Sequence, residues 1–260
     1  MGLKMKETVL ITGASSGIGL ELAKCFAADK ANLILVARGT ETLETLAAGL
    51  RREHEIIVQV ITADLSRAEA TAEIFDQAGG PVDVLVNNAG FGLHGGFAEL
   101  PLERQLEMIQ VNIAALVELT GRFLPGMIRR KRGGILNVGS VAGFLPGPNM
   151  AVYYATKAFV LSFGEALHEE LRGSGVGVTN LCPGPTESNF SQVARSHRMR
   201  ETRVHKMSAA AVAQTGHAAF RNGQCLSVPG LSNKLLTVVG SKILPRRTAR
   251  KLVKYYNRLK

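Results

Sequence analysis

Short, almost continuously apolar runs alternate with longer amphipathic runs over the first 180 residues of the chain. Apolar runs rich in β-branched residues predict strands, and apolar positions three and four apart predict helices. The predicted strands are ETVLIT (7–12), NLILVA (32–37), IIVQVI (56–61), VDVLVN (82–87), GGILNVG (133–139) and GVTNLC (177–182). The predicted helices are GIGLELAKCFAADK (17–30), ETLETLAAGLRRE (41–53), AEATAEIFDQAG (68–79) and YATKAFVLSFGEALHEELRG (154–173). Because strands apolar on both faces must be covered on both faces, the alternation predicts an α/β fold: a doubly wound parallel sheet (Rossmann fold) in three layers.

The pattern loosens after residue 190. Residues 191–206 are polar and basic, SAAAVAQTGHAAF (208–220) predicts a helix with Ser208 as its N-cap, and CLSV (225–228) predicts a last strand. From Pro245 onward, basic residues separate the apolar positions Leu252, Val253, Tyr256 and Leu259, which predicts a short basic amphipathic helix. We expect residues 1–230 to form the dinucleotide-binding and catalytic domain, and residues 231–260 to form a basic C-terminal extension of the same domain.

Charge is concentrated at one end of the chain. The net charge of the 260 residues is +10, but residues 191–260 carry a balance of +14 and residues 1–190 a balance of −4. A basic tail can be a solvated face, a patch for acidic ligands or carriers, or a membrane or nucleic-acid surface. The chain has no Trp and no basic runs interleaved with aromatic residues, which argues against nucleic acid, whereas peripheral membrane contact through the terminal helix stays an alternative.

The cysteines and the N-terminus predict a cytoplasmic protein. Cys25, Cys182 and Cys225 lack the paired spacing of a zinc site or a disulfide framework, and the six histidines form no ligand pair, so no metal is expected. The apolar run TVLITGA is too short for a signal peptide, and we find no uninterrupted apolar run of about 18 to 20 residues, the length that crosses a bilayer.

A glycine-rich turn, TGASSGIG, joins the first predicted strand to the first predicted helix. Glycines at this place allow a sharp turn and a close approach to a pyrophosphate, although such turns also serve tight packing alone. The second strand ends in Ala37 and Arg38, where NAD-binding folds usually offer an acid to the ribose. An arginine without a carboxylate suits a 2′-phosphate and favours NADP, the alternative being a surface arginine that begins a loop.

Five motifs in order extend this pattern: TGASSGIG, NNAG (87–90), VGS (138–140), YYATK (153–157) and PGPTES (183–188). With them the chain resembles the short-chain dehydrogenase/reductase family over residues 7 to about 228, in its shorter branch of about 250 residues with TGxxxGxG and YxxxK motifs. The resemblance implies an oxidoreductase that interconverts ketones and secondary alcohols with a nicotinamide cofactor, usually as a homodimer or homotetramer.

The resemblance also implies roles for individual residues. Tyr153 matches the acid/base tyrosine, Lys157 its lysine partner, Ser140 the serine that holds the substrate oxygen, and Asn112 the asparagine that supports a proton-relay water. The residues expected along the cofactor are Gly13, Ser15, Ser16, Gly17, Ile18, Gly19, Arg38, Asp64, Leu65, Asn88, Ala89, Gly90, Tyr153, Lys157, Pro183, Gly184, Thr186 and Ser188. The family often has threonine at position 188, and Ser188 retains the hydroxyl.

Helical spacing alone leaves the two tyrosines undecided, since Tyr154 at i−3 from Lys157 is nearly as well placed as Tyr153 at i−4. The interval from Ser140 and the family pattern choose Tyr153 and leave Tyr154 as a packing residue. A free tyrosine has a pKa of about 10, and we expect the lysine charge and an oxidised nicotinamide ring to lower the pKa of Tyr153. Taken singly, each motif residue also has a purely structural interpretation.

The substrate is expected to be a small carbonyl or alcohol compound selected by the region after PGPTES. Phe190, Met199 and Met207 could form an apolar lid, and the basic end of the chain suits an acidic coenzyme A or carrier-linked acyl thioester. A fatty or steroid-like ketone belongs to the same expected class as the acyl thioester. Small polar carbonyl compounds are an alternative, and a catalytically idle NADP-binding sensor is another. His94 is expected to be a solvated loop residue, with a place beside the substrate as the alternative.

Overall fold

Seven parallel strands form the central sheet of the protein. The computed structural model describes residues 6–187, 206–239 and 244–257, and the side chains of Val238 and Tyr256 are outside this description. The strand order is β3-β2-β1-β4-β5-β6-β9, and every neighbouring pair is parallel. The strands are β1 (Thr8–Thr12), β2 (Asn32–Ala37), β3 (Val58–Thr62), β4 (Val84–Asn87), β5 (Gly133–Val138), β6 (Val176–Leu181) and β9 (Leu226–Ser227). The predicted doubly wound sheet is confirmed, with its order reversing between β1 and β4.

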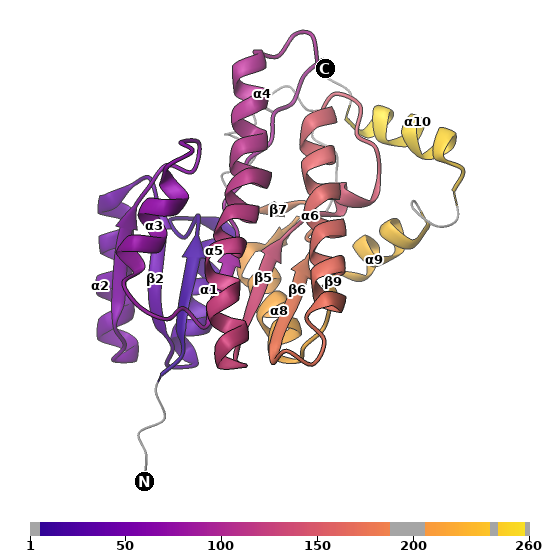
Figure 1. The fold of residues 1–260 in the computed structure, drawn as a ribbon. Coiled ribbons are helices and arrows are strands. Elements are labelled where there is room, and N and C mark those ends of the chain that lie inside the picture. Colours follow the sequence, from indigo (N-terminus) through magenta and orange to yellow (C-terminus); the bar gives the residue numbers. More distant parts are fainter. Residues whose placement is uncertain (1–5, 188–205, 240–243, 258–260) are drawn as a thin grey trace.

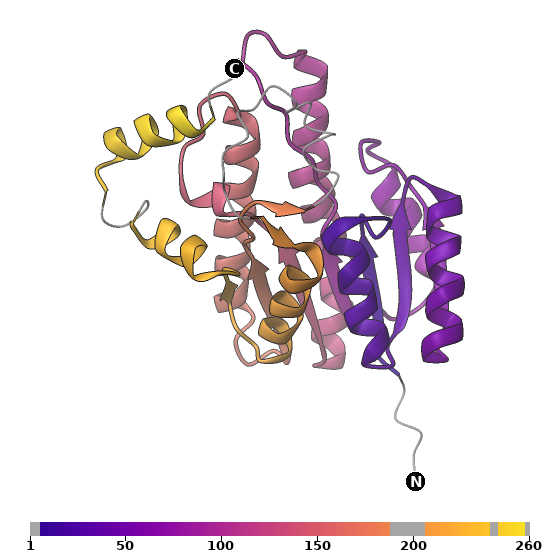
Figure 2. The same ribbon diagram turned by 180° about the vertical axis from the view of Figure 1, so that it is seen from behind.

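Helices cover both faces of this sheet (Figures 1 and 2). One face packs against α1 (Gly17–Ala28), α2 (Thr40–His54) and α8 (Ala209–Arg221). The other packs against α3 (Ala70–Ala78), α5 (Ala115–Arg130) and α6 (Ala151–Glu170). Along β1, Val9 and Ile11 belong to the first layer of the core and Leu10 to the second, so alternate side chains feed opposite faces. This alternation explains why the strands are apolar throughout.

An asparagine ladder crosses the middle of the sheet. Asn87, Asn137 and Asn180 stand opposite one another on β4, β5 and β6. The amide of Asn87 donates to Oδ1 of Asn137 at 3.0 Å, and the amide of Asn137 donates to Oδ1 of Asn180 at 3.4 Å. Buried amides need such partners, so this ladder fits only one alignment of the three strands.

The helices between β4 and β5 lie outside the sequence predictions. They are α4 (Leu102–Ile109), the π-helical turn Gln110–Ala114 and α5, which together form a continuous helical run. The run Leu102–Arg130 has the length and composition of a membrane-crossing helix, a test that the core helix of a globular protein also passes. Leu119, Phe123 and Met127 of α5 are buried in the second core layer, so we assign this run to the core.

The later part of the chain follows the predicted order. α8 begins after Ser208, whose hydroxyl accepts a hydrogen bond from the Ala211 N–H at 3.2 Å, as expected for an N-cap. The predicted last strand is β9, and the predicted basic helix is α10 (Arg246–Tyr256). Further elements are a 3₁₀ turn (Val141–Phe144), α9 (Leu231–Val238) and a small pair formed by β7 (Thr186–Glu187) and β8 (Met207–Ser208). The division at residue 230 stays a prediction.

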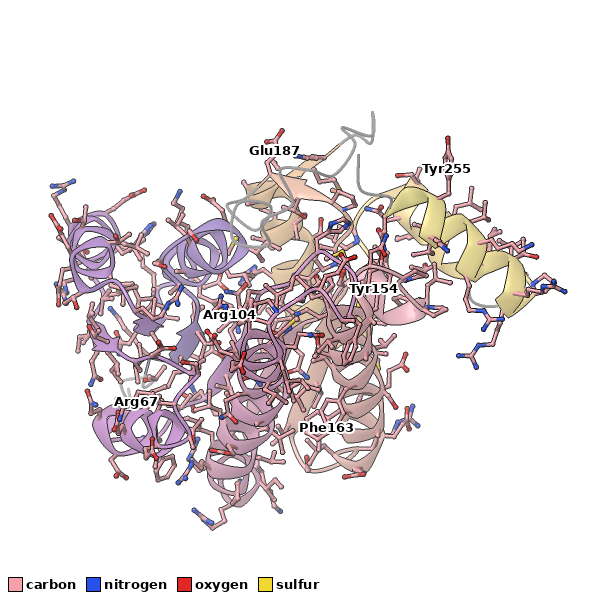
Figure 3. The ribbon with its side chains drawn as sticks, turned by 90° about the horizontal axis from the view of Figure 1, so that it is seen from above. Arg67, Arg104, Tyr154, Phe163, Glu187 and Tyr255 are labelled. Atoms are coloured by element: carbon pink, nitrogen blue, oxygen red, sulfur yellow. The ribbon has the colours of Figure 1, made fainter. Side chains whose placement is uncertain are left out.

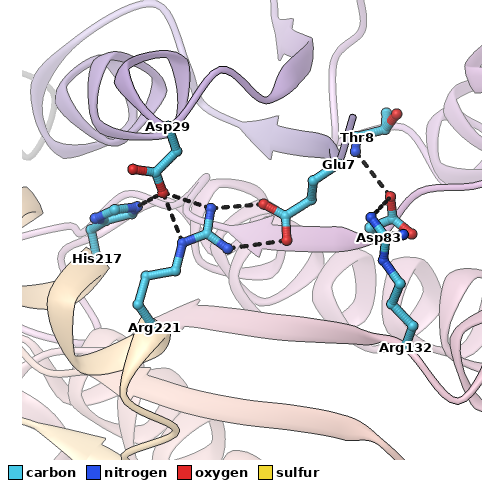
Figure 4. A network of polar contacts seen from close by, with 7 residues as sticks. All are labelled: Glu7, Thr8, Asp29, Asp83, Arg132, His217 and Arg221. Carbon is cyan, nitrogen blue, oxygen red and sulfur yellow. Dashed lines mark hydrogen bonds and ion pairs between the residues drawn. The ribbon is translucent and has the colours of Figure 1, made fainter. Parts of the chain in front are cut away.

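A network of charges ties α8 to the start of the sheet (Figure 4). The guanidinium of Arg221 contacts both carboxylate oxygens of Glu7, at 3.0 and 2.7 Å, and Oδ2 of Asp29 at 2.9 Å. The ring of His217 contacts the same Asp29 oxygen at 2.9 Å. Arg221 also lies over the ring of Phe26, 5.0 Å from its centroid. The helix is thereby joined to both ends of the first βα unit.

Candidate active site

The glycine-rich turn between β1 and α1 is held against the end of β4. Nδ2 of Asn88 donates to the carbonyl oxygens of Thr12 at 2.8 Å and Gly13 at 3.1 Å. Gly13 and Gly17 have φ values of +65° and +56°, which favour glycine. A Cβ atom at Gly19 would lie 2.3 Å from the Gly13 oxygen, so this position also requires glycine. The turn is therefore built for close backbone approach at the switch point of the sheet.

The N-terminus of α1 opens at this turn and fits a phosphate group. Ser16 is the N-cap residue and makes no side-chain cap hydrogen bond, and the first turn carries no acidic residue. Ser16 is exposed, while Ser15 and Ile18 are partly exposed. Backbone N–H groups at a helix start carry partial positive charge, which attracts a pyrophosphate. These residues fit the phosphates of a dinucleotide cofactor.

Arg38 and Asp64 lie beyond the ends of β2 and β3, where the sequence predicts the adenosine part of the cofactor. Arg38 is exposed, and Leu65 is buried below Asp64 in the second core layer. Partial burial raises the pKa of Asp64, but hydrogen bonds from Ser66 and the charges of Arg38 and Arg67 outweigh it and lower this pKa overall. A carboxylate beside exposed arginines can accept hydrogen bonds from an adenine amino group. The positions of Arg38 and Asp64 in the structure are compatible with contacts to the adenosine part of a cofactor. These roles stay predictions.

Ser140 and Tyr153 meet at the carboxyl end of β5. Ser140 follows β5 and caps the 3₁₀ turn, its Oγ accepting from the Ala142 N–H at 3.1 Å. Tyr153 is in the first turn of α6 and only 8% exposed. Burial raises the pKa of Tyr153 to about 12, partly offset by a hydrogen bond with the Ser140 side chain. In the protein chain without a cofactor the pKa of Tyr153 is therefore raised, because desolvation of the phenolate dominates. The expected lowering by the lysine charge together with an oxidised nicotinamide ring stays a prediction.

Lys157 lies one helical turn after Tyr153 and is 6% exposed. Its Nζ donates to the carbonyl oxygen of Val138 at 2.8 Å, so the lysine joins α6 to the end of β5. Burial lowers the pKa of Lys157 to about 8. At neutral pH the group is still mainly an ammonium, but it releases its proton far more readily than an exposed lysine.

Asn112 comes from the π-helical turn and reaches the same region. Its Nδ2 donates to the Phe91 carbonyl oxygen and to Oγ1 of Thr156, both at 3.0 Å, and its Oδ1 accepts from the Phe91 N–H at 3.1 Å. A Cβ atom at Gly90 would lie 3.0 Å from this Oδ1 and 3.5 Å from Nζ of Lys157. Gly90 therefore lets the backbone approach both polar atoms closely, and a side chain there would crowd Oδ1 of Asn112.

The PGPTES segment packs against the 3₁₀ turn that follows Ser140 and against α9. The carbonyl oxygen of Pro183 accepts from the Val141 N–H at 3.0 Å, and Oγ1 of Thr186 donates to the Gly184 carbonyl oxygen at 2.9 Å. A Cβ atom at Gly184 would lie 2.3 Å from Oδ1 of Asn233, so the start of α9 packs directly on this segment. Ser188, Phe190 and Met199 lie outside the described residues.

His94 is buried, so its interpretation as a solvated loop residue is wrong. It is 6% exposed, and its Nε2 contacts the carbonyl oxygen of Asn257 at 3.0 Å. Nδ2 of Asn149 donates to the same oxygen at 2.9 Å, and Nδ2 of Asn257 contacts the Tyr154 hydroxyl at 3.4 Å. Burial lowers the pKa of His94, only partly offset by its bond to Asn257. The loop histidine is covered because the end of α10 folds back over it.

Several supporting residues were missed by the sequence analysis. Thr12 Oγ1 accepts from the backbone N–H groups of Asn88 and Ala89, each at 3.0 Å, and thereby fixes the NNAG segment. Thr156 orients Asn112, and its place three residues after Tyr153 was an available signal because it shares that helix face. Asn257 had no such signal, since its partners are more than 100 residues away.

Comparison with known families agrees with this geometry. The model of a family described as short chain dehydrogenase matches residues 7–199. The chain belongs to the short chain dehydrogenase family. Membership confirms the predicted fold and enzyme class, an oxidoreductase that acts on CH–OH or keto groups.

Two relatives of this short chain dehydrogenase carry the same name, very-long-chain 3-oxoacyl-CoA reductase. The protein from Laccaria bicolor is 35% identical over 202 residues, which are 75% of this chain and 59% of the relative. The protein from Coprinopsis cinerea is 33% identical over 252 residues, which are 92% of this chain and 74% of the relative. The chain thus spans about three fifths of the length of the first relative.

Solved structures of the family cover nearly the whole chain. A short-chain dehydrogenase from Sphingobium yanoikuyae in complex with NADPH is 34% identical, has a TM-score of 0.83, and the match covers 91% of this chain and 93% of that one. A member from Burkholderia phymatum in complex with NAD is 25% identical, has a TM-score of 0.81, and the match covers 92% and 94%. The family match and these complexes support a nicotinamide cofactor, with NADPH in one neighbour and NAD in the other.

Proposed function

We propose that this short chain dehydrogenase reduces the 3-keto group of long-chain acyl thioesters, with NADPH as the hydride donor. The observation that carries the proposal is the group formed by Ser140, Tyr153, Lys157 and Asn112 at the carboxyl ends of the strands. The names of the two 3-oxoacyl-CoA reductase relatives support a keto thioester. The basic C-terminal region supports an acidic, coenzyme A or carrier-linked substrate.

Ser140 and Tyr153 would have different roles in the reduction of a carbonyl group. The nicotinamide cofactor supplies the hydride that reaches the carbonyl carbon. Ser140 holds the carbonyl oxygen, and the Tyr153 hydroxyl donates a proton to it. With a pKa of about 12 in the protein, Tyr153 is protonated at neutral pH, which is the state a proton donor needs. A positioned acid of this kind typically contributes about 10² to 10⁴ in rate.

Lys157 and Asn112 would restore the proton of Tyr153. An ammonium with a pKa of about 8 gives up its proton more easily than an ordinary lysine. Asn112 uses both amide hydrogens on Phe91 and Thr156, and Oδ1 retains one free lone pair next to Gly90. A water held there by Oδ1 and by the Lys157 ammonium would connect the tyrosine side of the site to solvent.

The NADP preference is proposed from Arg38. Its guanidinium is exposed beyond β2, where it could pair with a 2′-phosphate, and the chain has no carboxylate at Ala37 or Arg38 to repel one. Gly13, Gly17 and Gly19 would hold the pyrophosphate at the start of α1, and Asn88, Ala89 and Gly90 would line the nicotinamide ribose. A strong preference for NADH would overturn the role of Arg38.

The deciding experiment is a substrate screen with 3-oxoacyl-CoA compounds of increasing chain length, bulky ketones and small polar carbonyls. Each compound is offered with NADPH and with NADH, and oxidation is followed by absorbance. We expect turnover to be highest with long-chain 3-oxoacyl-CoA and NADPH. Turnover only with small polar carbonyls would contradict the proposed substrate class.

Two tyrosine variants provide the matched control for the chemistry. Tyr153→Phe should lower turnover by at least 10²-fold while NADPH binding, measured by fluorescence titration, is unchanged, because only the proton donor is lost. Tyr154→Phe should retain most of the activity, because the hydroxyl of Tyr154 contacts Asn257, whereas the hydroxyl of Tyr153 is the one hydrogen-bonded with Ser140. The reverse result would overturn the assignment. Tight NADPH binding without turnover of any compound would favour an NADP-binding sensor instead.

A further inference from the structure

The two last described helices carry large apolar side chains on their outer faces. Leu231 and Leu235 of α9 are 85% and 65% exposed, and Leu252 and Tyr255 of α10 are 55% and 62% exposed. In each pair the residues are three or four positions apart and share one helix face. Tyr255 points away from the body of the fold in Figure 3. These four large side chains are therefore mainly exposed, and packing in the core of this chain does not account for their apolar character.

Other faces of both helices pack against the protein. Thr237 is buried on α9, and Ala249 and Val253 are buried on α10. Asn233 contacts the Pro229 carbonyl oxygen at 2.7 Å, and Asn257 contacts the Pro148 carbonyl oxygen at 3.0 Å. Both helices are thus held in place by other residues, and the exposed leucines are not needed to attach them.

The same surface is strongly basic. Residues 231–260 contain nine Lys and Arg residues and no Asp or Glu. All five basic residues of α10 are exposed, and the ion pairs among the described residues include none of them: Arg246, Arg247, Arg250, Lys251 and Lys254. Exposed leucines and tyrosine next to unpaired cations form a surface that suits a partner with both apolar and anionic parts.

This surface lies beside the candidate active site. Helices α9 and α10 project at the β9 edge of the sheet, on the opposite side from α2 (Figures 1 and 2). Asn257 at the end of α10 contacts the loop before α6 and the Tyr154 hydroxyl. Asn233 at the start of α9 packs on Gly184 of the PGPTES segment. Both helices therefore contact segments that carry candidate site residues or their direct neighbours.

We propose that the outer faces of α9 and α10 form a docking surface for an anionic lipid bilayer. The leucines and Tyr255 enter the interface between headgroups and acyl chains, and the cations of α10 bind lipid phosphates. A second copy of this chain fits less well, because a two-fold contact over α10 would bring the same positive charges together. Docking by this surface would bring the site next to the membrane. The inference does not depend on the proposed substrate.

Vesicle co-sedimentation with the full chain tests the proposal. We expect binding to vesicles of phosphatidylcholine and phosphatidylglycerol in equal parts to be at least tenfold tighter than to phosphatidylcholine alone. Added salt should weaken this binding, because the surface charges are screened. Absence of binding, or equal binding to both vesicle types, would overturn the proposal.

Two matched double variants distinguish binding by the cations of α10 from attraction by the net positive charge of the whole protein. Arg247→Gln with Lys251→Gln should weaken binding to the anionic vesicles several-fold. Arg52→Gln with Arg129→Gln removes the same charge from exposed positions elsewhere and should leave binding unchanged. Equal losses in the two double variants would show attraction by net charge alone and would overturn the proposal.

The apolar part is tested by Leu235→Ser with Leu252→Ser. This double variant should also weaken vesicle binding several-fold, while NADPH affinity stays unchanged because neither residue is at the cofactor positions. Light scattering of the wild type and this variant gives the oligomeric state. A smaller oligomer in the variant would assign the leucines to contacts between copies and would overturn the proposal. Since vesicle binding is read without turnover, the result is independent of the proposed reaction.

Discussion

Burial shifts the pKa values of the two central ionisable residues in opposite directions. Tyr153 and Lys157 are both buried at the carboxyl end of β5, and desolvation favours the neutral form of each. A neutral tyrosine is a proton donor, and a lysine with a pKa of about 8 can exchange its proton near neutral pH. Burial of the two side chains is therefore the cause of the pKa shifts that suit them to acid–base chemistry.

The shifted lysine predicts a pH-dependent stability difference. The pKa of Lys157 is about 8 in the folded chain against 10.5 in the unfolded chain, so the unfolded state binds more protons between these values. Burial of the ammonium therefore lowers the free energy of unfolding below about pH 8, and this destabilisation disappears as the pH rises to about 10.5. Lys157→Met has no such charge to bury. The difference in the free energy of unfolding between this variant and the wild type should therefore fall by roughly 3 kcal/mol in favour of the wild type from pH 8 to 10.5. Urea unfolding of both proteins at several pH values measures this difference, and a constant difference would contradict it.

At the scale of elements, the turns between strands and helices hold the candidate site residues, and the helices cover the sheet that positions these turns. The β1–α1 turn, the NNAG segment after β4 and Ser140 after β5 all lie at the carboxyl end of the parallel sheet. The sequence predicts these positions well, because glycine spacing and strand ends are local signals. The π-helical turn that presents Asn112 was not predicted, since its hydrogen-bond pattern depends on packing between α4 and α5.

A pair of glycine variants tests the role of the β1–α1 turn. In Gly19→Ala the new Cβ would meet the Gly13 oxygen at 2.3 Å and Nδ2 of Asn88 at 2.4 Å, so the turn must shift. We expect at least tenfold weaker NADPH binding and a stability loss of about 1–3 kcal/mol. Isothermal titration and thermal unfolding measure these effects.

Gly49→Ala is the control for the same substitution within a helix. Nothing lies within 4 Å of a Cβ at Gly49 of α2, so this variant should bind NADPH normally and gain up to about 1 kcal/mol of stability. Normal NADPH affinity in Gly19→Ala would show that the turn tolerates a side chain and would argue against its proposed contact with the pyrophosphate.

At the scale of the whole molecule, contacts distant in sequence close the structure. Arg221 joins α8 to Glu7 and Asp29, and Asn257 joins α10 to His94 and Asn149. Apolar periodicity in the sequence predicts the helices α8 and α10 but none of these contacts. Side-chain pairs separated by 100 residues or more leave no periodic signal, which is why His94 was wrongly assigned to solvent.

The Arg221 network should contribute measurably to stability. Arg221→Gln removes charged hydrogen bonds to two carboxylates and the contact with Phe26, and we expect a loss of about 1–3 kcal/mol in the free energy of unfolding. The control is Arg172→Gln, whose ion pair with Glu169 is 73% and 62% exposed and should contribute less than about 0.5 kcal/mol. Equal losses in chemical denaturation would mean that the network adds nothing beyond an ordinary surface pair.

The asparagine ladder across β4, β5 and β6 has a consequence for how the chain folds. The three strands are far apart in sequence, and parallel strands cannot assemble by closing a hairpin. A collapsed intermediate with one strand slipped by a residue would turn an asparagine out of line and leave buried amides without partners, whereas an all-apolar sheet would tolerate the slip. Asn137 is bonded to a neighbour on either side, so its hydrogen bonds favour the native alignment of the three strands over a slipped one.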